Sequence, residues 1–209
     1  GDGVNRIQPS LGLMLIAQIL INKGHKVKIY DAALDGWDNR SLIDQKNNVV
    51  LIGQSDDKIE KVISDFSPDI VAISVLFSNL LESAHNIARL IKKVKKNTKV
   101  ILGGNHISSA VTDYKISLID KNSNLSNTII DLENEHFDFG MIGEGEFSFA
   151  QLVNALINND DISKVPGLVK KIGKDRYLIN PINKVNDLNL LPKPARHLVD
   201  MEGYFKIGA

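Results

Sequence analysis

The strongest constraint on the fold is a repeated order of two kinds of segment. A short apolar run rich in β-branched residues is followed by a longer segment whose apolar residues recur at helical spacing. The apolar runs lie at residues 69–77, 99–104 and 137–143, and the clearest helical segments lie at 79–96 and 145–158. Strands that alternate with helices favour a parallel sheet with both faces covered.

This order predicts an α/β fold with a doubly wound, mostly parallel sheet of the Rossmann-like, flavodoxin type and helices on both faces. Residues 107–135 read as a broken helix and a polar loop. Residues 1–10 read as a loop, so we expect the strand that normally precedes the first helix to lie outside this sequence. Further expected elements are a helix at 10–23, a strand at 26–32, a polar insertion at 33–57 with one short strand at 49–53, a helix at 56–66, a hairpin at 165–185 and an extended, proline-marked segment at 186–200.

Composition excludes several classes of function. The 25 basic residues balance the 25 acidic ones, so no overall field attracts nucleic acid or an anionic membrane. The absence of cysteine removes disulfides, thiolate zinc sites and cysteine-held iron–sulfur clusters from this sequence. The longest apolar run, residues 11–21, is too short to span a bilayer and lacks the basic start of a signal peptide. We expect a cytoplasmic protein.

Three polar or glycine-rich segments follow the predicted strands, and we call them the tip segments: Ser74–Asn79, Gly103–His106 and Gly143–Glu146. Ligands of open α/β sheets bind at the carboxyl ends of the strands, so these segments predict the binding site. Two adjacent glycines cost backbone entropy, which suggests that another group approaches their backbone closely. The five histidines do not pair at metal-ligand spacing, and no metal ligand or catalytic residue is predicted.

Familiar motifs of other classes do not occur. There is no G-x-G-x-x-G after a strand, no P-loop and no G-x-S-x-G nucleophile elbow. A dinucleotide site, a P-loop nucleotide site and a serine-hydrolase site are therefore not expected.

A family resemblance rests on several short motifs. Ser74-Val75-Leu76 before Gly103-Gly104 resembles the S-x-L and G-G pattern of cobalamin-binding Rossmann domains. From about residue 7 to 205, ordered segments resemble the amino-terminal half of cobalamin-dependent radical S-adenosylmethionine enzymes, a group with C-methyltransferases and anaerobic magnesium-protoporphyrin monomethyl ester cyclases. These segments are "IQPSLGLMLIAQILINKGHKVKIYDA", "PDIVAISVLFSN", "VILGGNHIS", "FDFGMIGEGEFSFAQLVNAL", "VPGLV" and "LNLLPKPARHLVD".

The resemblance implies a corrinoid site. In that family the glycines admit the nucleotide tail of cobalamin and the serine hydroxyl bonds its benzimidazole. The family motif D-x-H-x-x-G, aligned on Gly12, meets Ile7 and Pro9, so the cobalt-ligating histidine is absent. The cofactor-binding residues that we predict are Asn5, Pro9, Leu11, Gly12, Ser74, Leu76, Ser78, Asn79, Gly103, Gly104, Asn105, His106, Gly143, Glu144, Gly145 and Glu146.

The implied organisation is a cobalamin-binding domain at residues 1–160, then a hairpin and linker at 161–209 that lead to a radical S-adenosylmethionine barrel outside this sequence. The barrel would hold the [4Fe–4S] cluster and S-adenosylmethionine, so this chain alone is not expected to be catalytic. The partners implied are cobalamin and that barrel, with no nucleic acid and no membrane. Two alternatives stay open: a small-molecule or nucleotide-binding regulatory module, and a Rossmann-like sugar-nucleotide transferase.

Overall fold

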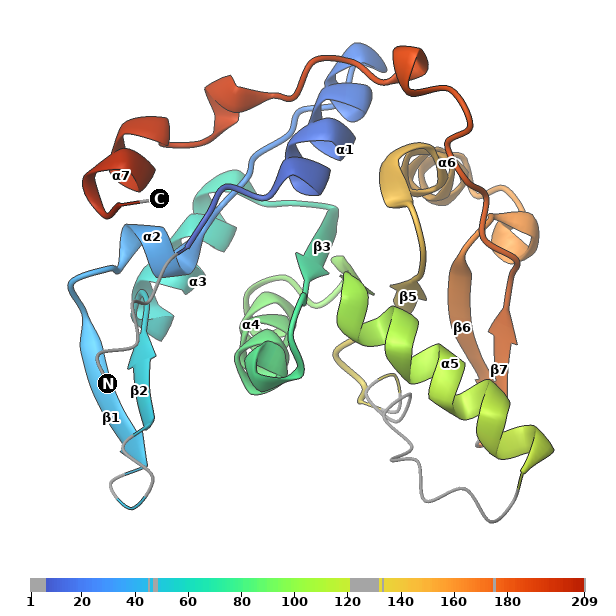
Figure 1. Cartoon of the computed structure of the whole chain (residues 1–209), viewed down its shortest axis with the longest axis horizontal. Coiled ribbons are helices and arrows are strands. Elements are labelled where there is room, and N and C mark those ends of the chain that lie inside the picture. Colours follow the sequence, from blue (N-terminus) through green and yellow to red (C-terminus); the bar gives the residue numbers. More distant parts are fainter. Residues whose placement is uncertain are drawn as a thin grey trace. The chain divides into compact units, whose positions relative to one another are not determined.

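A computed structural model describes residues 7–44, 46, 49–120, 132, 134–174 and 176–208. The chain divides into two compact units, Ile63–Leu190 and a second unit made of Gly1–Val62 with Leu191–Ala209. Each is described by itself (Figure 1). Among the described residues, none of the helices has the length and apolar character needed to cross a membrane.

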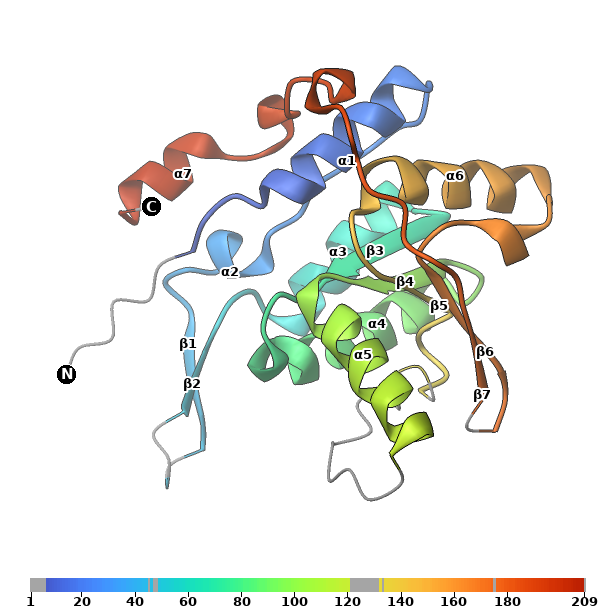
Figure 2. The ribbon, with the colours of Figure 1, turned by 45° about the vertical axis from the view of Figure 1, so that its right-hand side comes forward.

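The unit Ile63–Leu190 contains a five-stranded sheet with the strand order β3-β4-β5-β6-β7 (Figures 1 and 2). The strands are β3 Ile70–Ser74, β4 Lys99–Gly103, β5 Phe139–Met141, β6 Leu168–Gly173 and β7 Arg176–Ile179. Strands β3, β4 and β5 are parallel, whereas β6 is antiparallel to β5 and β7 to β6. The α/β, Rossmann-like prediction is confirmed, and the expected hairpin joins the same sheet.

Helices cover this sheet on both faces, with α4 and α5 on one face and α6 on the other (Figure 2). The helices are η1 Ser78–Leu80, α4 Leu81–Val94, α5 Asn105–Ile119, α6 Gly145–Asn158, η3 Ile162–Lys164 and η4 Leu188–Leu190. Phe139, Gly140 and Met141 of β5 are all buried, which requires cover on both faces. The most deeply buried large side chains include Leu90, Ile101, Leu102, Ile107, Leu152 and Leu168.

Strand β3 departs from the expectation for its apolar run. It lies at the edge of the sheet, and Ala72 at its centre is exposed. The central residues of β4 and all of β5 are buried, whereas no residue of β3 is fully buried.

The second unit holds α1 Leu11–Asn22, α2 Ala32–Asp35, the antiparallel hairpin β1 Arg40–Asp44 and β2 Val49–Ile52, the first part of α3 Asp56–Phe66, η5 Arg196–Leu198 and α7 Met201–Lys206. The predicted helix at 10–23 is confirmed as α1, and the Ser10 hydroxyl accepts a hydrogen bond from the Leu13 N–H as its cap. The short strand expected at 49–53 is β2. Its partner β1 and helix α2 were not predicted.

The strand predicted at 26–32 is wrong. Residues 25–31 form neither helix nor strand, and Ala32 already begins α2. The Asp31 carboxylate accepts hydrogen bonds from the N–H groups of Ala33 and Leu34, at 3.0 and 3.1 Å, and so caps α2. Alternating apolar residues favour an extended backbone, but a strand also needs a neighbour to pair with, and alternation does not supply one.

Contacts between distant parts of the sequence hold the second unit together. The Tyr204 hydroxyl of α7 donates a hydrogen bond of 2.6 Å to the other Asp31 carboxylate oxygen. The Ala195 N–H donates to the Met14 carbonyl of α1 at 3.1 Å. Burial and the bond to Asp31 raise the pKa of the Tyr204 phenol above its ordinary value. The segment after residue 190 is thereby fixed to the first helices of the chain.

The broken helix predicted at 107–135 is also corrected. Helix α5 is continuous from Asn105 to Ile119, so Asn105 and His106 lie in its first turn and not in a loop. The polar loop predicted at 120–127 falls almost entirely outside the described residues. Hydroxyl groups of α5 bond the preceding turn, as Thr112 does to the Ser108 carbonyl at 3.1 Å.

Candidate binding site at the carboxyl ends of the strands

Two tip segments meet because β3 and β4 are paired in parallel register. Ser74 at the end of β3 lies opposite Gly103 at the end of β4. Beyond the sheet, the Val75 N–H donates to the Gly103 carbonyl at 2.9 Å, and the His106 N–H donates to the Val75 carbonyl at 3.0 Å. Two backbone hydrogen bonds thus join the first two tip segments.

The two adjacent glycines have different reasons to be glycine. Gly104 has a φ of +96°, and a Cβ atom there would lie 2.8 Å from the backbone N and C of Val75. Among the residues that the structure describes, a Cβ at Gly103 would meet nothing closer than the Ile73 carbonyl oxygen at 3.9 Å. Gly104 therefore allows protein backbone to pack against it, and Gly103 leaves a backbone surface open for another molecule.

His106 is buried beside this glycine pair. Its side chain is 5% exposed, and its Nδ1 lies 2.9 Å from the Ser78 hydroxyl in a hydrogen bond. Both residues were predicted to bind the cofactor. The geometry shows that they also bind one another, which joins α5 to η1 at the start of α4.

Ser108, one turn into α5, was not predicted from the sequence. Its hydroxyl donates to the Gly104 carbonyl at 3.3 Å and accepts from the Gly143 N–H at 3.3 Å. It therefore connects the second tip segment to the third. The signal that was available is its position four residues after Gly104, where a helical serine reaches back to a carbonyl.

The third tip segment contacts the chain that follows β7. Gly143 has a φ of +74°, and a Cβ atom there would lie 2.7 Å from Cγ2 of Ile182. The Glu144 carboxylate accepts a hydrogen bond of 2.6 Å from the Val185 N–H. One carboxylate oxygen of Glu146 is buried without a hydrogen-bond partner among the described residues. Glu144 thus binds protein backbone in this structure.

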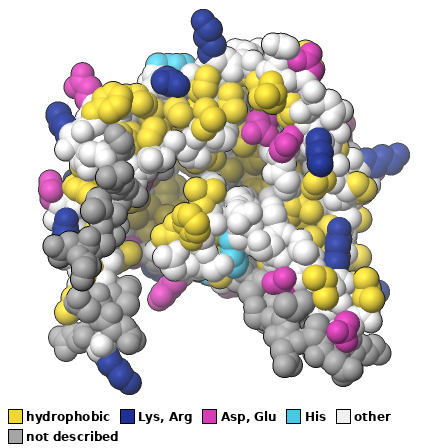
Figure 3. Space-filling view, in the orientation of Figure 1, with side chains coloured by type: hydrophobic (Ala, Val, Ile, Leu, Met, Phe, Trp, Pro, Cys, Tyr) yellow, Lys and Arg dark blue, Asp and Glu magenta, His cyan; other side chains and the backbone are white. Residues whose placement is uncertain are grey.

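Apolar side chains remain exposed between β3 and α4. The exposed fractions of Leu76, Phe77 and Leu80 are 51%, 68% and 46%. Asn79 and Asn105 are exposed as well. Figure 3 shows hydrophobic side chains at the surface on the face of the molecule seen in Figure 1. Exposed apolar groups in the segment that follows β3 suit a ligand with a large apolar surface.

The remaining predicted residues belong to the second unit or begin α6. Pro9 precedes the cap of α1, and Leu11 and Gly12 form its first turn, all in the second unit. Leu11 is 55% exposed, and within the described part of the chain a Cβ at Gly12 would meet no heavy atom beyond its own helix within 4 Å. Asn5 lies outside the described residues. Gly145 and Glu146 begin α6, which has no side-chain cap. The roles of all these residues in cofactor binding stay predictions.

Comparison with known proteins gives the site a context. The B12 binding domain family matches residues 4–120, which is more than half of the chain. The cytidylyl-2-hydroxyethylphosphonate methyltransferase of Streptomyces wedmorensis is 29% identical over 95% of this chain and 38% of its own length. An uncharacterized methyltransferase of Pyrococcus horikoshii is 27% identical over 94% of this chain and 35% of its own. The chain spans about a third of these curated relatives.

Two solved structures share the fold. The cobalamin-dependent S-adenosylmethionine radical enzyme OxsB, with aqua-cobalamin and S-adenosylmethionine bound, aligns with a TM-score of 0.65 and 17% identity over 98% of this chain and 23% of its own. The radical S-adenosylmethionine methyltransferase TsrM of Kitasatospora setae, with cobalamin and a [4Fe–4S] cluster bound, aligns with a TM-score of 0.55 and 15% identity over 92% of this chain and 30% of its own.

Proposed function

Because this chain belongs to the B12-binding domain family, we propose that it binds a cobalamin at the carboxyl ends of β3, β4 and β5. The observation that carries the proposal is the open backbone of Gly103 in register with Ser74. A planar group can approach this backbone without meeting a side chain, and the Ser74 hydroxyl at the neighbouring tip offers a donor and an acceptor.

The surroundings of Gly103 fit such a group. Leu76, Phe77 and Leu80, in the segment that follows β3, are exposed apolar side chains, and the exposed amide of Asn79 in the same segment can bond polar substituents of the cofactor. Gly104 also shapes the loop, because its backbone packs against Val75. When bound, cobalamin supplies a cobalt centre for methyl transfer, and the residues of this chain hold and orient it.

We also propose that the chain is the cobalamin-binding part of a larger methyltransferase that uses S-adenosylmethionine and an iron–sulfur cluster held by another domain. Support comes from the two curated methyltransferases, of which the chain spans about a third. The alternative reaction for the larger protein is a cyclisation that uses the same two cofactors, cobalamin and S-adenosylmethionine. The division at residue 160, the barrel as partner and a cytoplasmic location stay predictions. The regulatory module and the sugar-nucleotide transferase are not favoured by these relatives.

An ultraviolet–visible titration of the chain with hydroxocobalamin tests the proposal. We expect a saturable spectral change in the unsubstituted chain and at least a tenfold weaker affinity, about 1.4 kcal/mol, in Gly103→Leu. The leucine would fill the open space without backbone strain, since Gly103 has an ordinary φ. The matched control is Ala72→Leu, at an exposed position of neighbouring β3, which should bind normally.

Two results would contradict the proposal. One is equal affinity of Gly103→Leu and the unsubstituted chain, which would place the ligand elsewhere. The other is no spectral change with either this chain or a longer protein that includes the following domain.

A further inference from the structure

The first turns of α5 contact all three tip segments. From His106, the backbone N–H reaches the Val75 carbonyl at 3.0 Å and the ring reaches the Ser78 hydroxyl at 2.9 Å. From Ser108, the hydroxyl reaches the Gly104 carbonyl and the Gly143 N–H, each at 3.3 Å. Two side chains of one helix therefore connect the loops that follow β3, β4 and β5.

These contacts matter because the helices that follow the β4 and β5 tips have no side-chain cap, although Ile182 and Val185 also contact the third tip segment. Neither α5 nor α6 begins with a side-chain cap, since Gly104 and Glu144 make no such hydrogen bond. Gly104 and Gly143 both have positive φ angles. Glycine adopts such a conformation readily, but it adopts others as readily, so the residue type alone does not fix the backbone there. Their conformation must be fixed by partners, and Ser108 is a partner of both.

We propose that His106 and Ser108 are positioning residues that hold the three tip segments in the arrangement that cobalamin binds. The inference rests on the proposed function. Ser108 fixes the spacing between the β4 and β5 tips, and His106 fixes Ser78 and the start of α4. Neither side chain needs to touch the cofactor, because a preformed site avoids the cost of ordering loops on binding. This role differs from the ligand contact that the sequence predicted for His106.

The test begins with the cofactor-free chain. Hydrogen exchange followed by nuclear magnetic resonance reports the Gly143 amide, which donates to the Ser108 hydroxyl. We expect Ser108→Ala to raise its exchange rate about tenfold, as loss of one hydrogen bond allows. Ser108→Thr keeps a hydroxyl and should restore slow exchange. Ser109→Ala, the exposed neighbour in the same helix, is the matched control and should leave exchange unchanged.

The second arm measures hydroxocobalamin affinity in the same variants. We expect the Kd to rise about tenfold in Ser108→Ala, to recover in Ser108→Thr and to stay unchanged in Ser109→Ala. Ser78→Ala removes the partner of His106 at an exposed position, so the chain should fold normally and bind several-fold more weakly.

Different outcomes overturn different statements. Unchanged exchange at Gly143 in Ser108→Ala would overturn the positioning role, and so would faster exchange with unchanged Kd. Faster exchange throughout the unit, without selectivity for Gly143, would show a merely structural role and also overturn it. Absence of binding by the unsubstituted chain and by a longer protein would instead remove the proposed function, and the positioning role with it.

Discussion

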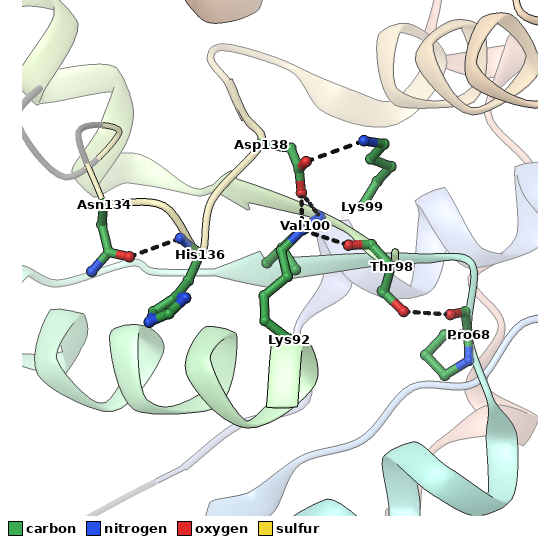
Figure 4. A network of polar contacts seen from close by, with 8 residues as sticks. All are labelled: Pro68, Lys92, Thr98, Lys99, Val100, Asn134, His136 and Asp138. Atoms are coloured by element: carbon green, nitrogen blue, oxygen red, sulfur yellow. Dashed lines mark hydrogen bonds and ion pairs between the residues drawn. The ribbon is translucent and has the colours of Figure 1, made fainter. Parts of the chain in front are cut away.

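At the amino ends of β4 and β5, charged side chains hold the sheet together (Figure 4). The loops at its carboxyl ends are joined instead by backbone groups and by the side chains of His106 and Ser108. The Asp138 carboxylate binds the Lys92 ammonium at 2.6 Å, the Val100 N–H at 2.8 Å and the Lys99 ammonium at 3.3 Å. Lys92 also donates to the Thr98 carbonyl at 2.7 Å. Most of these bonds are charge-assisted and shorter than the 3.3 Å contacts of Ser108, so they are the stronger set.

The two ends of the sheet differ in how fully their polar groups are bonded within the protein. Lys92 and Asp138 are 15% and 19% exposed, and the buried Thr98 hydroxyl donates to the Pro68 carbonyl at 2.8 Å. The amino end thus satisfies its polar groups within the protein. The carboxyl end keeps Gly103 open and Phe77 exposed. A fixed end and an accessible end on the same strands allow a ligand to be received with little change in the core.

The largest expected loss of stability distinguishes the two adjacent glycines at the carboxyl end of β4. Gly104→Ala should lower the free energy of unfolding by about 3 kcal/mol, because the new Cβ meets the Val75 backbone and the φ is positive. Gly103→Ala, the adjacent control, should change it by less than about 1 kcal/mol. Urea unfolding followed by circular dichroism measures both. Equal losses would mean that the glycines share one structural role.

The next effect concerns the amino end. Asp138→Ala should cost about 2 kcal/mol, since it leaves the mostly buried Lys92 ammonium without its carboxylate, and solvent access reduces the full cost of a broken buried pair. Asp69→Ala is the control: Asp69 binds Lys95 at 2.9 Å but is 91% exposed, so its loss should cost less than about 0.5 kcal/mol. Chemical denaturation compares the two.

The same Asp138 variant tests the separation of the two ends. Under conditions where it is fully folded, its cobalamin affinity should equal that of the unsubstituted chain. A weaker affinity would show that the amino end also shapes the site, which would contradict the comparison.

The smallest expected loss of stability concerns Tyr204, which lies in the second unit and outside the five-stranded sheet. Tyr204→Phe removes one hydrogen bond to Asp31 and should cost about 1 kcal/mol at pH 7. The pKa of the Tyr204 phenol is raised in the folded chain, so this stabilisation is complete below the ordinary tyrosine pKa of about 10 and is lost as the pH rises toward the folded value. Fluorescence of Trp37, the single tryptophan and part of the same unit, follows unfolding. A difference between the two proteins that persists unchanged at pH 11 would contradict this assignment.

The sequence predicted those parts of the fold that local patterns determine. Helix α3 at 56–66 and helix α6 at 145–158 have the predicted bounds, and the tips of β3 and β4 lie side by side as expected. Apolar spacing and capping act within a few residues, so one sequence is enough to read them.

What the sequence could not predict depends on distant partners. The alternation at 26–32 does not reveal that Asp31 caps α2 and binds Tyr204. No local pattern shows that Gly104 packs against Val75 or that the Ser108 hydroxyl spans two strand tips. In each case the constraint comes from residues that only the fold brings together. The predicted list includes Ser74, Gly103 and Gly104, whose roles in binding stay predictions, and it does not include Ser108.

The attachment of the chain after β7 has a mechanical consequence. Ile182 lies against Gly143, and the Val185 N–H is bonded to Glu144, so residues 182–185 are fixed to the loop that follows β5. Tension applied along the backbone beyond residue 185 would load the Glu144 bond before it reached β7. A pull on the residues after 185 would therefore displace the loop that follows β5 before it displaced β7.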